Sequence, residues 1–328
     1  MTETLTTTTY PTTRAYRTRV ARISRLSEHF VRFTFADDDL QHFGTGGLDQ
    51  RIKLMLPRAD GTLPEVGLFD DPAPAMMEWY SRWRQLPDEE RNALRTYTVR
   101  DVRPEAREID VDFVLHGIQG PASAWALGAG VGDELVILGP DERSETGGRG
   151  RSGGIEWDPG TARTVLLVGD ETAAPAICSV LETLPEEFTG HVFLEVPGAS
   201  DILPVDTRAK VQLNWLPRGD RPHGEVLSEA VRAWGREFGA EVAGGGAGAG
   251  GGAGARGVSG AEADPAEDPD ATLWEVPPTS PHGHWYAWLA GEAGTITGLR
   301  RHLVKDLGID KKCVSFMGYW KQGRAEGS

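Results

Sequence analysis

Apolar and polar residues alternate with a period of two over most of the first half of the chain. This alternation is typical of antiparallel strands that bury one face. The segments concerned are Arg19–Leu26, Val31–Phe35, Ile52–Leu56, Arg95–Val102, Ile109–Leu115 and Glu134–Leu138. Six such strands, separated by turn residues, predict a small antiparallel β-barrel.

The periodicity changes in the second half. Thr164–Val168 is a continuous apolar run, as expected for a parallel strand that is buried on both faces. Helices are predicted up to Leu184, from Gly224 to Phe238 and from Ala293 to Leu307. Further strands are predicted at His191–Val196, Lys210–Trp215, Trp285–Ala290 and Cys313–Tyr319. Alternating strands and helices predict an α/β domain with a mostly parallel sheet, of the nucleotide-binding type, with ligands at the carboxyl ends of its strands.

The predicted organisation is therefore two domains with flexible additions. We expect a tail over residues 1–15, a barrel over 16–145, a glycine-rich linker over 146–160 and an α/β domain over 161–328. A Gly/Ala tract and an acidic segment at about 240–271 should be disordered, because they cannot bury apolar surface. Within the barrel region, the segment Gly61–Leu94 holds a Trp/Tyr cluster that forms either a binding wall or part of the core.

Composition narrows the class of protein. The chain has 328 residues and a formal net charge of −15, and none of its apolar runs approaches the length of a membrane-spanning helix. The acidic excess disfavours nucleic acid and anionic membranes as partners. The two cysteines, Cys178 and Cys313, lie far apart, which argues against a disulfide scaffold, a zinc site or an iron–sulfur cluster. With no apolar core of a secretion signal at the N-terminus, we predict a reducing, cytoplasmic location without membrane insertion.

The strand Arg95–Arg100 has arginine, tyrosine and threonine side chains that are unusual together in a core strand. Alternation puts its tyrosine and first arginine on one face and its two threonines on the other. A guanidinium, a phenol and a hydroxyl suit a flat ligand that bears phosphate. The alternative is an exposed edge strand with surface arginines.

A second motif, His116–Ala126, follows the predicted strand that ends at Leu115. Its glycines would let a backbone come close to a ligand, and Pro121 suits the first turn of a helix. The free N–H groups of that turn, together with the helix dipole, would hold a phosphate. Without context, the same residues are simply a turn before a helix.

Together these motifs resemble a known family. Arg95-Thr96-Tyr97-Thr98 is similar to the Arg-x-Tyr-Ser/Thr flavin signature of the ferredoxin-reductase superfamily. Its combination with the His-Gly and Gly-Pro-Ala-Ser-Ala-Trp-Ala residues of His116–Ala126 is closer to the siderophore-interacting proteins, which are FAD-containing ferric-siderophore reductases. Gly169–Thr172 and Gly318–Arg324 also look like that branch, so the likeness covers nearly the whole chain except the Gly/Ala-rich insert.

The resemblance implies a role for each matching residue. Arg95 would contact the FAD phosphates, while Tyr97, packed on the isoalloxazine, and Thr98, hydrogen-bonded near flavin N5, would be the catalytic positions. The other residues implied to bind the cofactor are Thr96, Val114, Leu115, His116, Gly117, Pro121, Ala122, Ser123, Asp170, Glu171, Thr172 and Ala173. Among these, Pro121–Ser123 would face the pyrophosphate with N–H groups and a hydroxyl.

The electron donor is where the chain departs from the wider superfamily. Reductases of that superfamily usually have a glycine–threonine turn and a Cys-Gly pair where this chain has Asp170-Glu171 and Glu292. Carboxylates repel a diphosphate, which weighs against NAD(P)H and favours an alternative, a reductase or electron carrier fed by ferredoxin. Asp201, with no arginine nearby, favours NADH over NADPH.

The implied reaction passes electrons from NAD(P)H through FAD to Fe(III) held in a siderophore, so that Fe(II) is released. It requires no metal ligand from the protein. Lys53, Lys321 and Arg324 are candidates for contacting a large, often anionic chelate, and each of them is otherwise an ordinary surface residue. A non-enzymatic ferric-siderophore carrier with the same fold is the third hypothesis.

Overall fold

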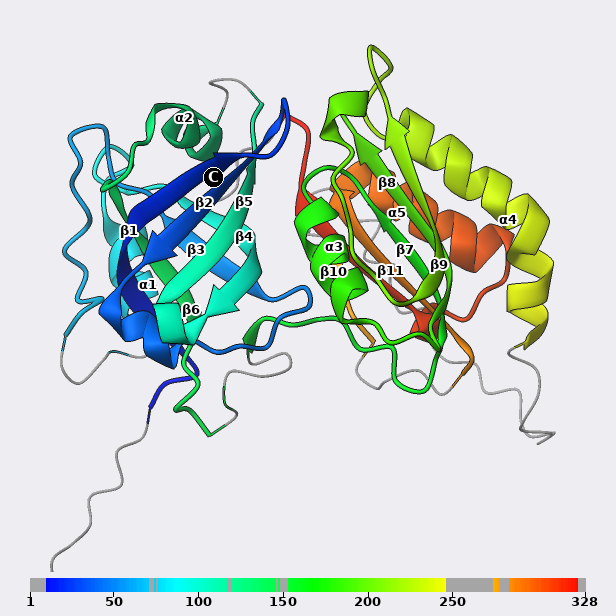
Figure 1. The fold of residues 1–328 in the computed structure, drawn as a ribbon, viewed down its shortest axis with the longest axis horizontal. Helices are drawn as coiled ribbons and strands as arrows, with labels where there is room; N and C mark the ends of the chain where they lie inside the picture. Colours follow the sequence, from blue (N-terminus) through cyan, green and yellow to red (C-terminus); the bar gives the residue numbers. More distant parts are fainter. Residues whose placement is uncertain are drawn as a thin grey trace, which may run out of the picture. The chain divides into compact units, whose positions relative to one another are not determined.

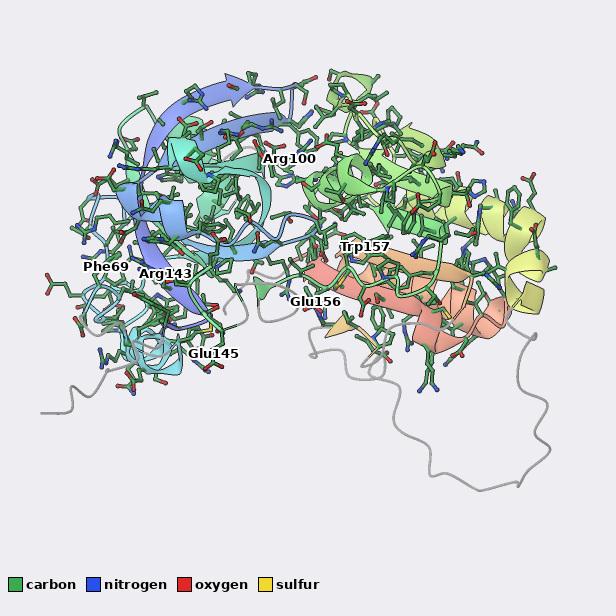
Figure 2. The ribbon with its side chains drawn as sticks, turned by 60° about the horizontal axis from the view of Figure 1, so that its bottom comes forward. Phe69, Arg100, Arg143, Glu145, Glu156 and Trp157 are labelled. Atoms are coloured by element: carbon green, nitrogen blue, oxygen red, sulfur yellow. The ribbon has the colours of Figure 1, made fainter. Side chains whose placement is uncertain are left out.

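Both predicted architectures are confirmed by the structure (Figure 1). The computed structural model describes residues 10–70, 74, 76–116, 120–145, 147, 153–245, 274–277 and 283–323. The chain divides into two compact units, and along the sequence the division falls between Glu156 and Trp157, which Figure 2 labels.

The first unit is a closed antiparallel barrel with the strand order β1-β2-β5-β4-β3-β6. Its strands are β1 (Thr13–Arg25), β2 (Phe30–Ala36), β3 (Arg51–Met55), β4 (Leu94–Arg103), β5 (Glu108–Val114) and β6 (Glu134–Pro140). The apolar residues that alternate along these strands fill the interior, where Phe33, Phe35 and Phe113 are completely buried. The period-two pattern therefore reports which face of each strand is inside.

The predicted tail was too long, because β1 begins at Thr13 and not at Arg19. The first half of β1 pairs with β6, from Thr13 opposite Pro140 onward, and its second half pairs with β2. Tyr16 is buried and donates its hydroxyl to the carbonyl of Pro140 over 2.8 Å. Residues 13–15 thus help to close the barrel.

Three short helices lie between the barrel strands, in addition to helix α2 (Pro121–Gly128). They are η1 (Asp38–His42), α1 (Met76–Gln85) and η2 (Pro104–Ala106). Trp79 and Trp83 of α1 are buried in an apolar cluster against Met55 and Leu94. Of the two interpretations of the Trp/Tyr cluster, core packing is therefore the correct one for these tryptophans.

The second unit is built on a six-stranded sheet in the order β10-β12-β11-β7-β8-β9. Its strands are β7 (Thr164–Gly169), β8 (Thr189–Val196), β9 (Lys210–Pro217), β10 (Trp274–Glu275), β11 (Trp285–Glu292) and β12 (Val314–Trp320). All neighbouring pairs are parallel except β10 with β12, and β10 was not predicted. The carboxyl ends of five strands consequently share one edge of the sheet.

Helices cover both faces of this sheet. They are α3 (Ala174–Thr183), α4 (Glu225–Gly245) and α5 (Ala293–Arg301), with a 3-10 turn η4 (Ala199–Asp201), a π-helical turn η6 (His302–Asp306) and a 3-10 turn η7 (Lys311–Cys313). Helices α4 and α5 pack on one face, where Val168, Leu227 and Leu299 belong to the same buried cluster (Figure 1). Helix α3 lies against the other face, beside Gly169.

Two predicted boundaries in the α/β unit differ from the structure. Helix α4 continues past Phe238 to Gly245, so residues 240–245 are helical, although we expected disorder from residue 240. Val242 explains part of this extension, because it packs against the apolar cluster under α4. Residues 246–271 of the predicted insert lie outside the described residues.

Part of the predicted linker is packed against the barrel. Glu156 lies within ion-pair distance of Arg51, 2.5 Å, and its backbone N–H donates to the buried carboxylate of Asp49. Gly154 has a φ of +82°, and a Cβ there would lie 2.7 Å from the carbonyl oxygen of Arg51. This end of the linker is therefore tied to β3 by contacts that its composition did not reveal.

Gly190 on β8 provides a direct test of the sheet. Its φ is +132°, and a Cβ would lie 1.9 Å from the carbonyl oxygen of Val165 on β7. Gly190→Ala should lower the free energy of unfolding by about 3 kcal/mol or more, measured by urea denaturation. Gly219→Ala is the control, because its φ is also positive, +55°, but nothing lies within 4 Å of the added Cβ. Equal losses in the two variants would contradict the close approach of β7 and β8.

Candidate functional site

The two faces of β4 present different chemistry, as its alternation predicts. Val99 is buried in the barrel core, and the Tyr97 ring packs on Phe113 with ring centroids 4.4 Å apart. Arg95 is half-buried on the same face and donates to the carbonyl of Leu94 over 2.8 Å. The aromatic and cationic residues of the signature are thus held at the margin of the core.

The opposite face of β4 brings a predicted substrate residue next to predicted cofactor residues. Lys53 on β3 is paired in register with Thr96, and its Nζ donates to the Thr96 hydroxyl over 2.6 Å. Thr98 is opposite Arg51 in the same ladder. Lys53, Thr96 and Thr98 therefore lie together on one side of a two-stranded ladder, although the sequence separates them widely.

Thr98 is largely buried on this ladder, with 6% of the residue exposed. Its hydroxyl is not among the buried side-chain atoms that lack a hydrogen-bond partner in the described part of the chain. Its contact near flavin N5 therefore stays a prediction from the resemblance.

Helix α2 supplies an anion site of the expected kind. Gly120 is its N-cap, has a φ of +90° and offers no side-chain oxygen to the first turn, which carries no acidic residue. Its first turn begins with Pro121, and its N–H groups are not capped by any side chain at Gly120. Ser123 is buried and its Oγ accepts the backbone N–H of His116 over 3.0 Å, which ties the preceding loop to the helix.

Aromatic contacts connect this helix to β4. Trp125 of α2 lies with its ring centroid 5.7 Å from that of Phe113, which in turn packs on Tyr97. Leu115 and Val114, at the end of β5, are both buried, and the Leu115 side chain belongs to the barrel core. The Leu115 side chain is thus part of the core beneath the end of β5.

Other predicted site residues cannot be joined to this group. Gly117 and Arg324 lie outside the described residues. Lys321 is exposed just after β12 of the second unit. The barrel alone therefore brings together most of the residues predicted to hold FAD and one of the three predicted to hold the substrate.

In the second unit, the four predicted residues Asp170–Ala173 form the turn between β7 and α3. The carboxylate of Asp170 accepts the backbone N–H and the hydroxyl of Thr172, and its carbonyl accepts the N–H groups of Ala173 and Ala174. The same carboxylate accepts the N–H of Glu292 over 2.8 Å and the indole N–H of Trp320 over 3.0 Å. Asp170 thus holds together the ends of β7, β11 and β12.

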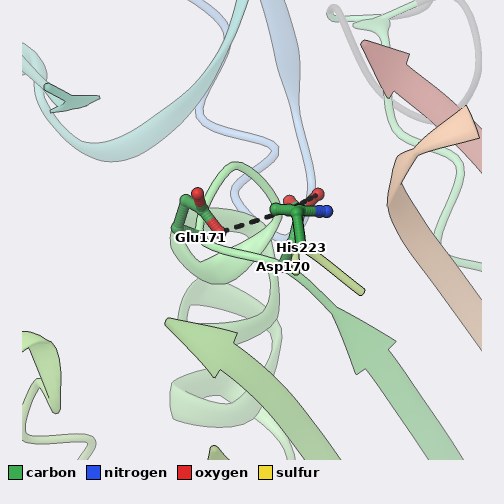
Figure 3. A group of neighbouring side chains, drawn as sticks. All are labelled: Asp170, Glu171 and His223. Carbon is green, nitrogen blue, oxygen red and sulfur yellow. Dashed lines mark ion pairs between the residues drawn. The ribbon is translucent and has the colours of Figure 1, made fainter. Parts of the chain in front are cut away.

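Glu171 is neutralised by two cations from the loop between β9 and α4, Arg218 and His223. Figure 3 shows Glu171 with His223 and the neighbouring Asp170. Arg218 donates to both of its carboxylate oxygens over 2.8 Å, and His223 Nε2 lies 3.6 Å from Glu171 Oε2 and 3.3 Å from Asp170 Oδ2. Burial alone would raise the pKa of Glu171, but His223 and Arg218 outweigh it and lower that pKa to about 2. Burial alone would lower the pKa of His223, but Asp170 and Glu171 raise it to about 10.

Two further carboxylates at this edge accept hydrogen bonds from the N-terminal N–H groups of helices. Glu195, near the end of β8, is completely buried and accepts the N–H groups of Gly224 and Leu227 at the start of α4. Glu292 is the N-cap of α5 and accepts the N–H of Thr295 over 2.8 Å. We call Asp170, Glu171, Glu195, Arg218, His223, Glu292 and Trp320 the edge cluster.

These contacts change the interpretation of the acidic residues that bear on the electron donor. Asp201 is buried and accepts the N–H of Gly198 in its own turn, so it offers no carboxylate to a ribose and carries no preference for NADH. Asp170 and Glu171 are not an exposed acidic surface, because cations and N–H groups surround them. Sequence reasoning missed Arg218 and His223. Their signal was two basic residues in a loop that follows a parallel strand.

Asp170, Glu171 and His223 also have the composition of a metal site, with ligand atoms within 4.8 Å of one another. Their oxygens, however, already accept hydrogen bonds from Thr172, Trp320 and Arg218. A guanidinium bonded to both oxygens of one carboxylate repels a second cation. Ion pairing accounts for this arrangement.

The raised pKa of His223 predicts a pH dependence of stability. Below its ordinary pKa of 6.5 the imidazolium contributes its full stabilisation, which is lost as the pH rises toward about 10. With discount for solvent screening, we expect a loss of about 2 kcal/mol in unfolding free energy over this window. His223→Gln should remove the dependence, whereas the exposed His284→Gln should retain it. Urea denaturation at pH 6.5, 8 and 10 measures both, and an equally steep decline in His223→Gln would contradict the ion pairing.

Comparison with known proteins places both units in one family. Residues 19–144 match the siderophore-interacting FAD-binding domain, and residues 162–323 match the siderophore-interacting protein family. An uncharacterised protein of Mycobacterium tuberculosis is 31% identical over 310 residues, which is 94% of this chain and 90% of that protein. Ferric vibriobactin reductase ViuB of Vibrio cholerae is 28% identical, over 92% of this chain and 87% of its own length.

A solved structure agrees with these matches. The siderophore-interacting protein SipS from Aeromonas hydrophila superposes with a TM-score of 0.62 at 26% identity, covering 96% of this chain and 95% of SipS. Within the described parts of the chain, no helix is long and apolar enough to cross a bilayer. The chain belongs to the siderophore-interacting protein family and has its FAD-binding domain and ferredoxin-reductase-like fold.

Proposed function

We propose that this protein is a cytoplasmic, FAD-dependent ferric-siderophore reductase. The observation that carries the proposal lies in the barrel, where the Arg95–Thr98 strand is linked through packed aromatic rings to a helix whose first turn has no acidic residue and no side-chain cap at Gly120. The residues present fit FAD, which needs donors for its diphosphate and a polar contact for its ring. The relative ViuB, named a ferric vibriobactin reductase, supports the choice of substrate class.

Each side chain has a defined task in this proposal. The N–H groups at the start of α2 and the Arg95 guanidinium hold the diphosphate, because both favour negative charge. Tyr97, supported by Phe113, provides a flat surface for the ring. Thr98 lies on the opposite face of β4, beside Lys53 and Thr96, and offers its hydroxyl to the flavin from there. FAD, when bound, accepts electrons in pairs and can give them up singly.

The ferric siderophore must be attracted to the site, and the iron must be released after reduction. Lys53 brings a positive charge to the Thr96–Thr98 face, and a ferric chelate with anionic oxygen ligands would be drawn toward it. Each Fe(III) takes up one electron and becomes Fe(II), so one electron pair serves two chelates. Fe(II) has less charge for the same hard oxygen ligands, binds them less tightly and leaves the siderophore.

Two sources of electrons remain to be distinguished, NAD(P)H and a reduced ferredoxin. The decisive comparison is anaerobic stopped-flow reduction of the FAD-loaded protein by NADH, NADPH and reduced ferredoxin, followed by addition of a ferric siderophore with a ferrous trap. Flavin bleaching and formation of the trapped Fe(II) complex are the expected results with the true donor. A purified protein that is colourless and binds the chelate without FAD would instead support the non-enzymatic carrier.

The flavin site makes a specific prediction for Arg95. Arg95→Ala should lose FAD on gel filtration, because one charge-assisted phosphate contact is worth about 1.5–3 kcal/mol. Arg22→Ala is the matched control, since Arg22 is an exposed barrel arginine paired with Glu108. The ratio of flavin absorbance to protein absorbance measures retention. A yellow, fully loaded Arg95→Ala protein would contradict the assignment.

A further inference from the structure

The carboxyl edge of the second sheet is the place where an α/β unit ordinarily receives a phosphate-bearing ligand. Parallel strands end there, and the helices that follow point their N-termini toward it. The uncapped N–H groups of such a terminus, with the positive end of the helix dipole, attract a diphosphate. The electron donor NAD(P)H carries this group, so the state of these termini bears on donor choice.

In this chain the backbone N–H groups at the start of these helices already donate to carboxylates of the second unit. The turn before α3 donates to Asp170, the start of α4 donates to Glu195 and the start of α5 donates to Glu292. The N–H groups of Ala173 and Ala174 are also committed, to the carbonyl of Asp170. A diphosphate arriving at this edge would have to displace an anion that is covalently part of the chain.

Displacement would be costly because the three carboxylates are fixed in place. Glu195 is completely buried and Asp170 is 1% exposed. Glu292 is 9% exposed, and its second oxygen accepts the N–H of Gln322 over 3.3 Å. Gly291 leaves room for this packing, since a Cβ there would lie 2.6 Å from the Asp170 carboxylate. The four carboxylates of the edge cluster also outnumber its two cations, so a further anion meets net negative charge.

We propose that Asp170, Glu195 and Glu292 are specificity-determining residues that exclude the diphosphate of a dinucleotide from the helix N-termini of the second unit. The flavin is therefore reduced by a donor that does not bind through a diphosphate at this edge. This inference rests on the proposed function, because it concerns the source of electrons for that reaction. It concerns only the donor, and the transfer from reduced flavin to iron is independent of it.

The test uses ADP-ribose, which carries the diphosphate of NADH but no nicotinamide. Isothermal titration of FAD-loaded wild-type protein with ADP-ribose, extended to several millimolar, should give a Kd of about 1 mM or weaker. Glu292→Ala frees the N-terminus of α5 and should tighten ADP-ribose binding by about tenfold or more. Glu229→Ala removes the same charge from an exposed position on α4 that caps no helix, and should leave the affinity unchanged.

A conservative variant keeps the test decisive if Glu292→Ala does not fold. Glu292→Gln retains a side-chain oxygen for the Thr295 N–H and removes only the charge, so binding should tighten by about threefold. Wild-type binding below about 10 μM would overturn the proposal. Unchanged affinity in a folded Glu292→Ala protein, or in Glu292→Gln, would overturn it as well.

The proposed function is checked separately in the same preparation. Chemically reduced flavoprotein, without any nucleotide, is mixed with a ferric siderophore and a ferrous trap. Formation of trapped Fe(II) upholds the reductase whatever the titration shows, and its absence rejects the reductase without affecting the titration. The two failures are therefore distinguishable.

Discussion

Closure of the six-stranded barrel is the constraint on which the flavin site depends. β4 pairs with β3 from Leu94 to Thr98 and with β5 from Val99 to Arg103. Along the part that pairs with β3, successive side chains alternate between the interior and the outer face of the barrel. One face therefore takes part in the core through Tyr97 and Val99. The other carries Thr96 and Thr98 beside Lys53.

The second unit differs from the barrel in how the N-termini of its helices are capped. Five strands bring their carboxyl ends to one edge, where a nucleotide-binding domain would keep its helix N-termini open. Here Asp170, Glu195 and Glu292 cap those turns, while Arg218 and His223 balance part of the negative charge. Helix α2 of the barrel differs, because Gly120 gives its N-terminus no side-chain cap.

Much of this organisation could be predicted from local pattern, and the failures have a common physical origin. Period-two alternation and continuous apolar runs report burial directly, so the six barrel strands and the five parallel strands of the second sheet were predicted, whereas the two-residue strand β10 was not. The start of β1 was missed because Thr13–Thr18 is mostly polar and is defined by its pairing with β6. The partners of Glu171 were missed because Arg218 and His223 are brought to it only by the parallel topology of β7, β8 and β9. Asp201 was interpreted wrongly because an aspartate that caps a turn and an aspartate that binds a ribose cannot be told apart by residue type.

The central claim is that this chain holds FAD on its barrel and passes electrons singly from it to siderophore-bound iron. The most direct measurement is an anaerobic single-turnover experiment that records flavin absorbance and trapped Fe(II) together. The account predicts that each reduced flavin is reoxidised as two Fe(III)-siderophore molecules yield two Fe(II). A reduced flavin that stays bleached in the presence of excess ferric siderophore would contradict it.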